Sequence, residues 1–564
     1  MTTDRGSRSR RLAAIAVALA ATLPSAAAAA GVAPAPRDVV ATAASAAALP
    51  AGAHFESELS PGLRMYRLAV PAGISAAAYA QQLAQAPDVF AAQPNTVLRG
   101  AGLASVCSEA PTETSLFLPG ALKALEKAVV TDPIAILDTG VSDAAPELGV
   151  RVRPGYNASA GTEDTSDLDG HGTEVAAAAA GDAASGRVGG VSPKSPILPI
   201  TIFNSAGDTT VDWVVKGISE AAKRGAGVIN LSSSAFVSDA KSGEVQVFQQ
   251  AIDAAFNRGV ITVGAIGNEN RGDPVMPGSL PHVITVGSAS LGGTRDAFSN
   301  FGPWLDLVAP GANLVLPAPP EVCLSGYGEA SGTSFAAPAV SGGIALIRAA
   351  QPKLGISQVF DLVRRLSSTP FVVGDIGRDD NTGFGLLDVS AGTSATATAN
   401  EPRELDDDVF WLKQDPKTHP TYLRSGRSTR VTGAVSAGKD PQDVVPVRLK
   451  RGETLTATAS SKTDNVLMEV SAWSPSTGSF DIGKGATRGF LTDSGGLSPN
   501  PRTVFQAKRT GTYYIAVAAP DLASAGDTQV SNITLAPRMP YSLTLTKTKA
   551  TAIKGTTKKK KKKK

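Results

Sequence analysis

Short, mostly apolar runs recur through the middle of the chain. They occupy Ile134–Leu137, Val228–Leu231, Val260–Val263 and Val283–Val286. Apolar residues at successive positions, without polar alternation, are typical of strands that are covered on both faces. The runs therefore predict buried strands of a mostly parallel sheet.

Between these runs, apolar residues repeat at helical spacing. One predicted helix ends before Gly225, and its apolar face comprises Val214, Ile218 and Ala221. The next ends before Gly259, and its apolar face comprises Val245, Phe248, Ile252 and Phe256. Glycine is a common helix stop because it readily adopts a positive φ. The alternation of strands and helices over residues 112–395 predicts a three-layer α/β domain with a mostly parallel sheet.

The segments on either side of this domain follow other patterns. Residues 34–62 are rich in alanine and proline, and we expect a flexible lead-in there. Residues 63–105 predict a small β-α-β unit, an α+β element whose helix is capped by Ser75. Over residues 400–546 the apolar period becomes two, and glycines and prolines separate the segments. This pattern predicts a small antiparallel β-sandwich.

The first residues of the chain have the layout of an export signal. Arginines precede the apolar run Leu12–Leu23, and an alanine-rich stretch with small-x-small cleavage options follows. The run is shorter than the roughly 20 apolar residues of a transmembrane helix. Residues 1–33 therefore predict a secretory signal peptide, although Arg10 and Arg11 leave a twin-arginine signal as an alternative. We expect the protein to be secreted.

The chain has two cysteines, Cys107 and Cys323, and their expected state depends on whether the protein is exported. In an exported protein a pair of cysteines favours a disulfide, and we expect one here. The alternative is two small buried or idle thiols.

The charge of the chain is concentrated at its C-terminus. The net charge of +3 includes the seven lysines of Lys558–Lys564, and without them the remainder would carry −4. This balance argues against a nucleic-acid partner. Residues 547–564 are expected to be a lysine-rich disordered tail. Such a tail would attract anionic cell-surface polymers by charge alone, or it would be an unselected end.

Three motifs place reactive side chains at strand ends and helix starts, where an open α/β sheet presents its functional crevice. Asp138 ends an apolar strand, His171 begins an alanine-rich helix, and Ser334 begins another helix. A serine hydroxyl is a poor nucleophile unless a base takes its proton, and histidine suits that task near pH 7. A carboxylate then fixes the imidazole tautomer and stabilises the imidazolium. The alternative is that all three residues only cap turns and helices.

Asn268 is a candidate donor to a developing oxyanion. It follows a strand and a glycine, and it would act together with the backbone N–H of Ser334. The other histidines, His54, His282 and His419, lie in lead-in or proline-flanked segments. We expect them to be surface or packing residues.

In this order, and with these neighbours, the motifs resemble those of the subtilisin-like serine proteases, the subtilases. The resemblance implies that Asp138 is the orienting acid, His171 the general base, Ser334 the nucleophile and Asn268 the oxyanion donor. It also implies a set of substrate-binding residues, namely Ser232, Ser233, Ser234, Ala265, Ile266, Gly267 and Thr333. The implied function is a secreted serine endopeptidase that acts on proteins or peptides through an acyl-enzyme. The alternative is a catalytically silent subtilase-like module for binding or adhesion.

The sequence departs from the usual family pattern at three positions. Glu174 stands where a second histidine is frequent, but that position is outside the triad. Ser234 replaces a frequent glycine, and Ile266 replaces a smaller residue, so both are expected to narrow the first specificity pocket. No cofactor is required for the implied chemistry. A structural Ca²⁺ on Asp164, Asp167 and Asp169 is possible for the family, although a solvated turn is favoured because the spacing of a calcium loop is incomplete.

The flanking segments carry further resemblances. Residues 63–105 are similar to the inhibitory propeptides of subtilases, which implies that the enzyme is made as a zymogen with its own N-terminal segment as inhibitor. The alternative is an accessory domain that is never removed. Residues 400–546 resemble the bacterial pre-peptidase C-terminal domain through motifs such as Asp-Val-Val-Pro-Val at Asp443. The alternative is a plain stabilising β module.

Overall fold

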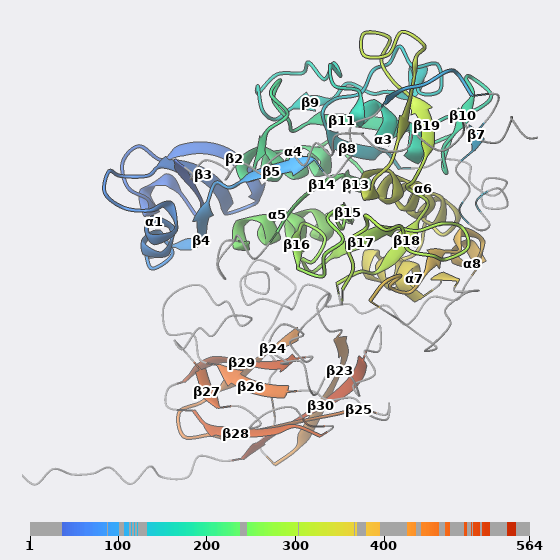
Figure 1. Cartoon of the computed structure of the whole chain (residues 1–564). Helices are drawn as coiled ribbons and strands as arrows, with labels where there is room; N and C mark the ends of the chain where they lie inside the picture. The colour runs from blue at the N-terminus through green and yellow to red at the C-terminus, as the bar shows by residue number, and fades with distance from the viewer. Residues whose placement is uncertain are drawn as a thin grey trace, which may run out of the picture. The chain divides into compact units, whose positions relative to one another are not determined.

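Figure 1 shows a computed structural model of the chain. The structure describes residues 37–86, 88–100, 106–111, 114–115, 118, 121, 132–236, 245–302, 304–365, 367–368, 380–394, 423, 426–435, 442–461, 469–473, 490–492, 498, 500–507, 510–518 and 539–548. The predicted signal peptide and almost all of the lysine-rich tail lie outside these residues.

The central sheet has the strand order β21-β22-β18-β17-β15-β13-β8-β11-β9. Its strands are β8 (Ile134–Asp138), β9 (Tyr156–Asn157), β11 (Ile197–Thr201), β13 (Val228–Leu231), β15 (Ile261–Ala265), β17 (Val283–Ser288), β18 (Leu307–Ala309), β21 (Ser367–Ser368) and β22 (Leu386–Leu387). Every pairing in this order is parallel except that of β21 with β22. The prediction of an α/β domain with a mostly parallel sheet is confirmed.

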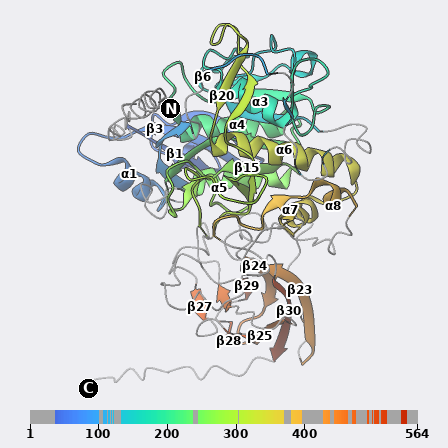
Figure 2. The same ribbon diagram turned by 45° about the vertical axis from the view of Figure 1, so that its right-hand side comes forward.

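Helices cover both faces of this sheet, as Figures 1 and 2 show. They are α3 (His171–Ala180), α4 (Val211–Lys223), α5 (Gln246–Asn257), α6 (Thr333–Ala350), α7 (Ile356–Arg365) and α8 (Val389–Ser394). One apolar cluster joins the sheet to α3 and α6, and another joins it to α4 and α5. The strands are therefore buried on both sides, which explains their continuous apolar runs.

The two glycines that were expected to end helices do so. Gly225 follows α4 with φ +81°, and Gly259 follows α5 with φ +83°. Side chains other than glycine are strained at these values, so glycine permits the sharp exit toward the next strand.

The N-terminal segment forms a four-stranded antiparallel sheet in the order β2-β3-β1-β4, with one helix beside it. Its elements are β1 (Asp38–Ala43), the 3-10 turn η1 (Ala46–Ala48), β2 (His54–Ser60), β3 (Leu63–Ala69), α1 (Ala76–Leu83) and β4 (Val89–Pro94). Ser75 caps α1 as predicted, since its side chain accepts a hydrogen bond from the backbone N–H of Ala78 at 3.2 Å.

The prediction of a flexible lead-in over residues 34–62 is wrong, because β1 and β2 lie within it. Residues of β1 are buried on both faces: Val39 and Ala41 pack toward α1, and Val40 packs in the cluster that contains α4 and α5. A strand enclosed in this way has no polar alternation, and its small alanines resemble linker composition.

Smaller sheets surround the ends of the central strands. One has the order β12-β5-β14-β16, a second β19-β20-β6, and a third pairs β7 with β10. Their strands are β5 (Val97–Gly100), β6 (Val106–Cys107), β7 (Thr114–Ser115), β10 (Val188–Gly189), β12 (Thr209–Thr210), β14 (Ser233–Phe236), β16 (Val275–Met276), β19 (Leu314–Pro317) and β20 (Tyr327–Ala330). A 3-10 turn, η2 (Gly149–Arg151), lies between β8 and β9 in the sequence.

The C-terminal residues form two four-stranded antiparallel sheets, β23-β30-β25-β28 and β24-β29-β26-β27. The strands are β23 (Ser428–Val435), β24 (Gln442–Leu449), β25 (Thr454–Ser461), β26 (Glu469–Trp473), β27 (Phe490–Thr492), β28 (Arg502–Gln506), β29 (Gly511–Ala518) and β30 (Met539–Thr548). Apolar side chains of both sheets form one buried cluster. The last strand extends past the expected boundary at 546, because Lys547 lies in β30 and pairs with Glu453 at 3.2 Å.

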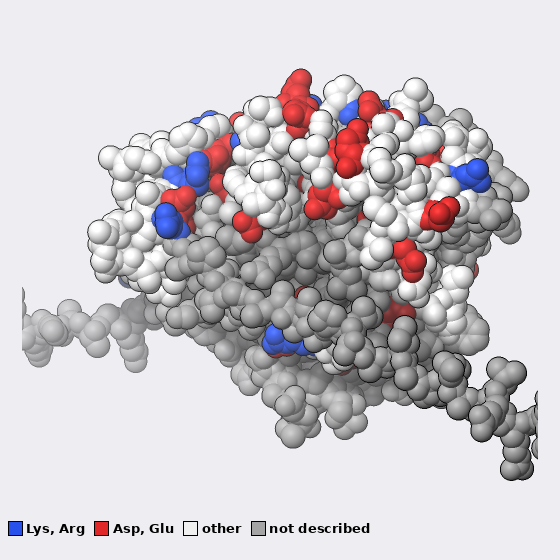
Figure 3. Space-filling model, turned by 45° about the horizontal axis from the view of Figure 1, so that its top comes forward, with Lys and Arg blue, Asp and Glu red and all other residues white. Residues whose placement is uncertain are grey.

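Charge on the described surface is mixed. On the face drawn in Figure 3, acidic and basic side chains lie among uncharged ones rather than in one basic patch. None of the helices in the described ranges is both long and apolar enough to cross a membrane.

Candidate active site

The first candidate pair is Asp138 at the end of β8 and His171 at the start of α3. Oδ1 of Asp138 lies 2.7 Å from Nδ1 of His171 and also accepts the backbone N–H of Thr139 at 2.8 Å. Asp138 is buried, with 1% of its surface exposed. The carboxylate holds a proton on Nδ1, so Nε2 is the nitrogen that can exchange a proton with a substrate or a nucleophile.

Asp167 holds these two segments together. Its carboxylate accepts hydrogen bonds from the hydroxyl of Thr139 at 2.9 Å, the N–H of Gly170 at 2.9 Å, and the N–H and hydroxyl of Thr173 at 2.9 and 2.5 Å. It thus ties the loop after β8 to the first turn of α3. Sequence reasoning considered Asp167 only as a possible calcium ligand and missed this role.

Hydrogen bonds within the chain engage all three aspartates considered as calcium ligands. The oxygens of Asp167 are committed to protein donors, Asp164 accepts from the N–H and hydroxyl of Ser166, and Asp169 accepts from the N–H of His171. Over the described ranges, no group of three or more His, Cys, Asp or Glu side chains could hold a metal ion.

Ser334 lies in the first turn of α6 and is fully buried. Its hydroxyl donates to the carbonyl oxygen of Ser232 at 3.3 Å. The ring of His171 lies 5.3 Å from that of Phe335, the residue after Ser334, measured between centroids. Among the residues that the structure describes, Nε2 of His171 has no hydrogen-bond partner. The serine and the histidine are thus neighbours without the hydrogen bond that catalysis requires, which is often long or unformed before substrate binds.

The protonation state of His171 is consistent with this arrangement. Burial is the largest single influence and lowers its pKa, but the charge and hydrogen bond of Asp138 raise it, as do the charges of Glu174 and Asp169. The net effect raises the pKa of His171 from 6.5 to about 9. A raised pKa favours the imidazolium, in which Nε2 carries a proton and cannot accept the Ser334 hydroxyl.

Asn268 is held against the start of α6. Its Oδ1 accepts the backbone N–H of Thr333 at 2.9 Å, and the hydroxyl of Thr333 accepts the N–H of Gly267 at 3.1 Å. The anchored oxygen sets the orientation of the amide, whose Nδ2 is the group able to donate to an oxyanion. The backbone N–H of Ser334 is a second candidate donor, because a helix has no internal acceptor for its first N–H groups.

Asn300 supports the same loop and was not singled out from the sequence. Its Oδ1 accepts the N–H groups of Glu269 and Arg271, and its Nδ2 donates to the carbonyl of Ile266 and the carboxylate of Glu269. The motif Phe-Ser-Asn-Phe-Gly around it was the available signal.

Ser233 and Ser234 open β14, which pairs with β5 in antiparallel register. Gly100 lies opposite Ser233, and Arg99 lies opposite Ser234. The edge of β14 that could pair with an extended peptide is therefore paired with the N-terminal part of the same chain.

The central part of the chain is similar to known serine proteases. The protein-family model of the Subtilase family matches residues 133–385. The chain is 35% identical over 248 residues to the major intracellular serine protease of Bacillus subtilis (strain 168), a match covering 41% of this chain and 75% of that protein. It is 31% identical over 260 residues to subtilisin Savinase of Lederbergia lenta, covering 46% and 90% respectively. It is 34% identical over 262 residues to subtilisin DY of Bacillus licheniformis, covering 46% and 89%.

The chain belongs to the subtilase family. It is a subtilisin-like serine endopeptidase, and its central domain has the subtilisin-like α/β fold.

The two departures from the family pattern near the expected specificity pocket lie in different surroundings in this subtilase. Ile266 is fully buried in an apolar cluster with Val275, Leu305 and Val308. Ala265 is also buried in the core, where β15 ends. Ser234 does face the loop, since its Oγ lies 3.3 Å from the position that a Cβ on Gly267 would occupy.

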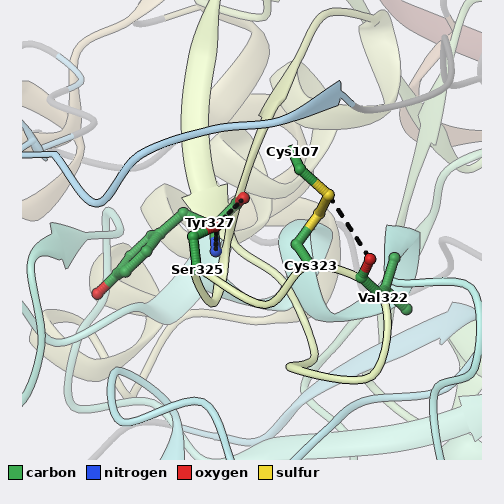
Figure 4. Close-up of a disulfide and its surroundings, with 5 residues drawn as sticks. All are labelled: Cys107, Val322, Cys323, Ser325 and Tyr327. Atoms are coloured by element: carbon green, nitrogen blue, oxygen red, sulfur yellow. Dashed lines mark hydrogen bonds between the residues drawn. A yellow bond between two sulfur atoms is a disulfide. The ribbon is translucent and has the colours of Figure 1, made fainter.

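The sulfurs of Cys107 and Cys323 are bonded in this subtilase, with 5.4 Å between the Cα atoms (Figure 4). Strand β6, which contains Cys107, also pairs with β20, which leads into the Ser334 segment. Val322, the residue before Cys323, lies close to Gly170 at the start of α3. A Cβ placed on Gly170 would be 3.4 Å from Cγ1 of Val322. The disulfide therefore anchors chain segments beside the candidate site.

His282 forms the second Asp–His contact described in this subtilase. Its Nδ1 lies 2.9 Å from Oδ1 of Asp253, and its ring stacks on Phe256 at 4.3 Å. His282 is buried in this packing, as expected of a structural histidine, whereas His54 is exposed beside Glu56. His419 lies outside the described residues.

Proposed function

We propose that this subtilase cleaves peptide bonds through an acyl-enzyme, with Ser334 as nucleophile, His171 as general base, Asp138 as orienting acid and Asn268 as oxyanion donor. The observation that carries the proposal is the 2.7 Å contact between Asp138 and His171 beside the first turn of the helix that holds Ser334. A buried carboxylate on Nδ1 leaves Nε2 as the base.

These residues account for every proton transfer in the proposed reaction. The Oγ of Ser334 attacks the substrate carbonyl carbon while its proton passes to Nε2 of His171, and Asn268 and the Ser334 N–H stabilise the oxyanion. When the C–N bond breaks, the imidazolium gives that proton to the leaving amine. Water then attacks the ester, His171 takes its proton and returns it to Oγ, and the carboxylic acid leaves. Asp138 remains ionised throughout.

A fluorophosphonate probe tests this assignment on the secreted protein. Wild type should be labelled and should hydrolyse casein, whereas Ser334→Ala should do neither. Asp138→Asn should lower kcat by about 10⁴-fold because it favours the wrong imidazole tautomer. Equal labelling of wild type and Ser334→Ala would overturn the proposal and favour a catalytically silent binding module.

We also propose that residues up to β5 act as the enzyme's own inhibitory propeptide. The pairing of Gly100 with Ser233 supports this, because it occupies the strand edge that an extended substrate would use. The segment therefore blocks access while it remains bound.

Two buried caps support the same role. Oε1 of Gln93 accepts the N–H of Val247 in the first turn of α5 at 2.9 Å, and Oδ1 of Asn95 accepts the N–H of Asp212 in the first turn of α4 at 3.0 Å. Helix N–H groups at these positions lack internal acceptors, so the propeptide stabilises both helices while it is attached. N-terminal sequencing of the active enzyme should find a start after Gly100 and no later than Cys107; a start before β5 would contradict removal.

Export, and an accessory role for residues 400–546, complete the proposal. A disulfide is expected of an exported protein, which favours a secreted enzyme with a cleaved signal peptide. The two C-terminal sheets and their shared core favour a β-sandwich related to the pre-peptidase C-terminal domain.

The lysine tail would hold the enzyme at anionic cell-surface polymers. Release from washed cells by salt, but not from cells expressing a tail-deleted chain, would test this attachment.

A further inference from the structure

A chain of buried hydrogen bonds lies behind Ser334 and links β13 to α6. The hydroxyl of Ser341 donates to Oδ1 of Asn230 at 2.9 Å, Nδ2 of Asn230 lies 2.9 Å from Oγ of Ser232, and that Oγ donates to the carbonyl of Ser334 at 2.8 Å. All four residues are fully buried. The chain therefore connects two elements of the core at the residue proposed as nucleophile.

The reason for this chain lies in the sequence of α6. In an α-helix the carbonyl of one residue accepts the N–H of the residue four positions later. Four positions after Ser334 stands Pro338, which has no N–H. The carbonyl of Ser334 thus lacks its regular donor four positions later, and a buried carbonyl without a donor is costly. The hydroxyl of Ser232 supplies the missing donor.

The direction of each bond is set by the next. Ser232 has a single hydroxyl hydrogen, which is available to the Ser334 carbonyl because Asn230 donates to Ser232 and does not compete for that hydrogen. The amide of Asn230 presents Nδ2 to Ser232 because its Oδ1 accepts from Ser341, whose hydroxyl also contacts the carbonyl of Ala337 at 3.2 Å. The contact with Ser341 therefore favours the orientation of the Asn230 amide that presents Nδ2 to Ser232.

Ser232 contacts Ser334 in both directions. Its hydroxyl holds the backbone of Ser334, and its own carbonyl accepts the Ser334 hydroxyl at 3.3 Å. A displacement of Ser232 would therefore move both the attacking Oγ and the N–H that faces the oxyanion.

We propose that Asn230 and Ser341 are positioning residues of the nucleophile, acting through Ser232 to place Ser334 relative to His171 and Asn268. This inference rests on the proposed function. Neither residue would touch substrate; their effect would appear in the rate of attack by Ser334 rather than in substrate binding.

The decisive variants are Ser341→Ala and Asn230→Asp in the full chain after export. Ser341→Ala removes the first donor. Asn230→Asp keeps the shape of the side chain but replaces the amide donor with an acceptor, so the Ser232 hydroxyl should turn to Asp and leave the Ser334 carbonyl without a donor. Ser195→Ala is the matched control, because it removes a buried contact between hydroxyls, 2.7 Å from Ser192, outside this chain of bonds.

Four quantities separate positioning from simple stability: the rate of fluorophosphonate labelling, kcat and KM for a chromogenic peptide, and Tm. Ser341→Ala should lower the labelling rate and kcat by about tenfold, the equivalent of one hydrogen bond. Asn230→Asp should lower both by about 100-fold, as expected for a misplaced reacting group. KM should stay within about twofold of wild type, since uniform binding is unaffected. Ser195→Ala should lower Tm and leave both rates unchanged.

The outcomes are distinguishable. Labelled wild type with unchanged rates in Ser341→Ala and Asn230→Asp would overturn the positioning role alone. Folded wild type that does not react with the probe would overturn the proposed function and the positioning role with it. If Asn230→Asp fails to fold, Ser341→Ala decides, because it removes only one buried oxygen.

Discussion

Removal of the charge of Glu174 should shift the pH profile of this enzyme. Glu174 is buried in the first turn of α3, three residues after His171, and its charge is one of those that raise the pKa of His171 to about 9. Because Glu174→Gln keeps the size of the side chain and removes the charge, it should lower the pKa of His171.

The magnitude for wild type follows from that pKa. The base in catalysis is neutral His171, and with a pKa of about 9 only about 1% of the molecules carry it at pH 7, against about three quarters for an ordinary histidine. The value of kcat/KM should therefore rise about tenfold for each pH unit between 6 and 8 and level off above pH 9. At neutral pH, Glu174→Gln should be more active than wild type, with the same alkaline plateau.

The assay is kcat/KM for an uncharged chromogenic peptide between pH 6 and 10.5 at constant ionic strength, since this parameter reports groups of the free enzyme. Glu163→Gln is the control, because it removes the same charge at an exposed site, where the side chain is 79% exposed. A wild-type midpoint near 6.5, or superimposable profiles for wild type and Glu174→Gln, would refute the reasoning.

The raised pKa of His171 also makes the stability of the fold depend on pH, in the direction opposite to the activity. The pKa of His171 is higher in the folded than in the unfolded state, so its protonation stabilises the fold fully below pH 6.5, and this contribution is lost as pH rises through 9. The contribution is at most about 3 kcal/mol. The enzyme should thus gain activity and lose stability over the same pH range.

Three further predictions concern the framework of the site. Replacing Cys107 and Cys323 together by serine should destabilise the enzyme by up to about 5 kcal/mol, since the bond closes a long loop; an unchanged Tm would contradict this. Gly172→Ala should reduce kcat in any folded product, because its Cβ would lie 2.1 Å from the carbonyl oxygen of Gly140 and push α3 away from Asp138; full activity would show that the backbone yields without cost. Asp167→Asn should lower kcat by about tenfold or more, since an amide cannot accept all the bonds that hold the loop before α3; activity equal to wild type would argue that this loop does not position His171.

The local patterns in the sequence were sufficient for most of the central domain. The mostly apolar runs at β8, β13 and β17 identify strands because a sheet covered on both faces favours apolar side chains at successive positions. Gly225 and Gly259 identify helix ends because only glycine adopts their φ without strain. The candidate triad was recognised in the same way, since each of its members sits in a short motif at the end of a strand or the start of a helix.

Other features depend on contacts between residues far apart in the chain, and only the folded structure decides them. Strand β1 looked like a linker because its small residues carry no periodic signal, and what defines it is burial between two layers. The side chain of Ile266 is buried among Val275, Leu305 and Val308, residues that follow it at a distance in the sequence. Asp167 and Asn230 act through partners that packing brings to them. Ser341, the partner of Asn230, lies 111 positions away in the sequence. A sequence records which side chains could donate or accept, whereas the tertiary structure decides which of them meet.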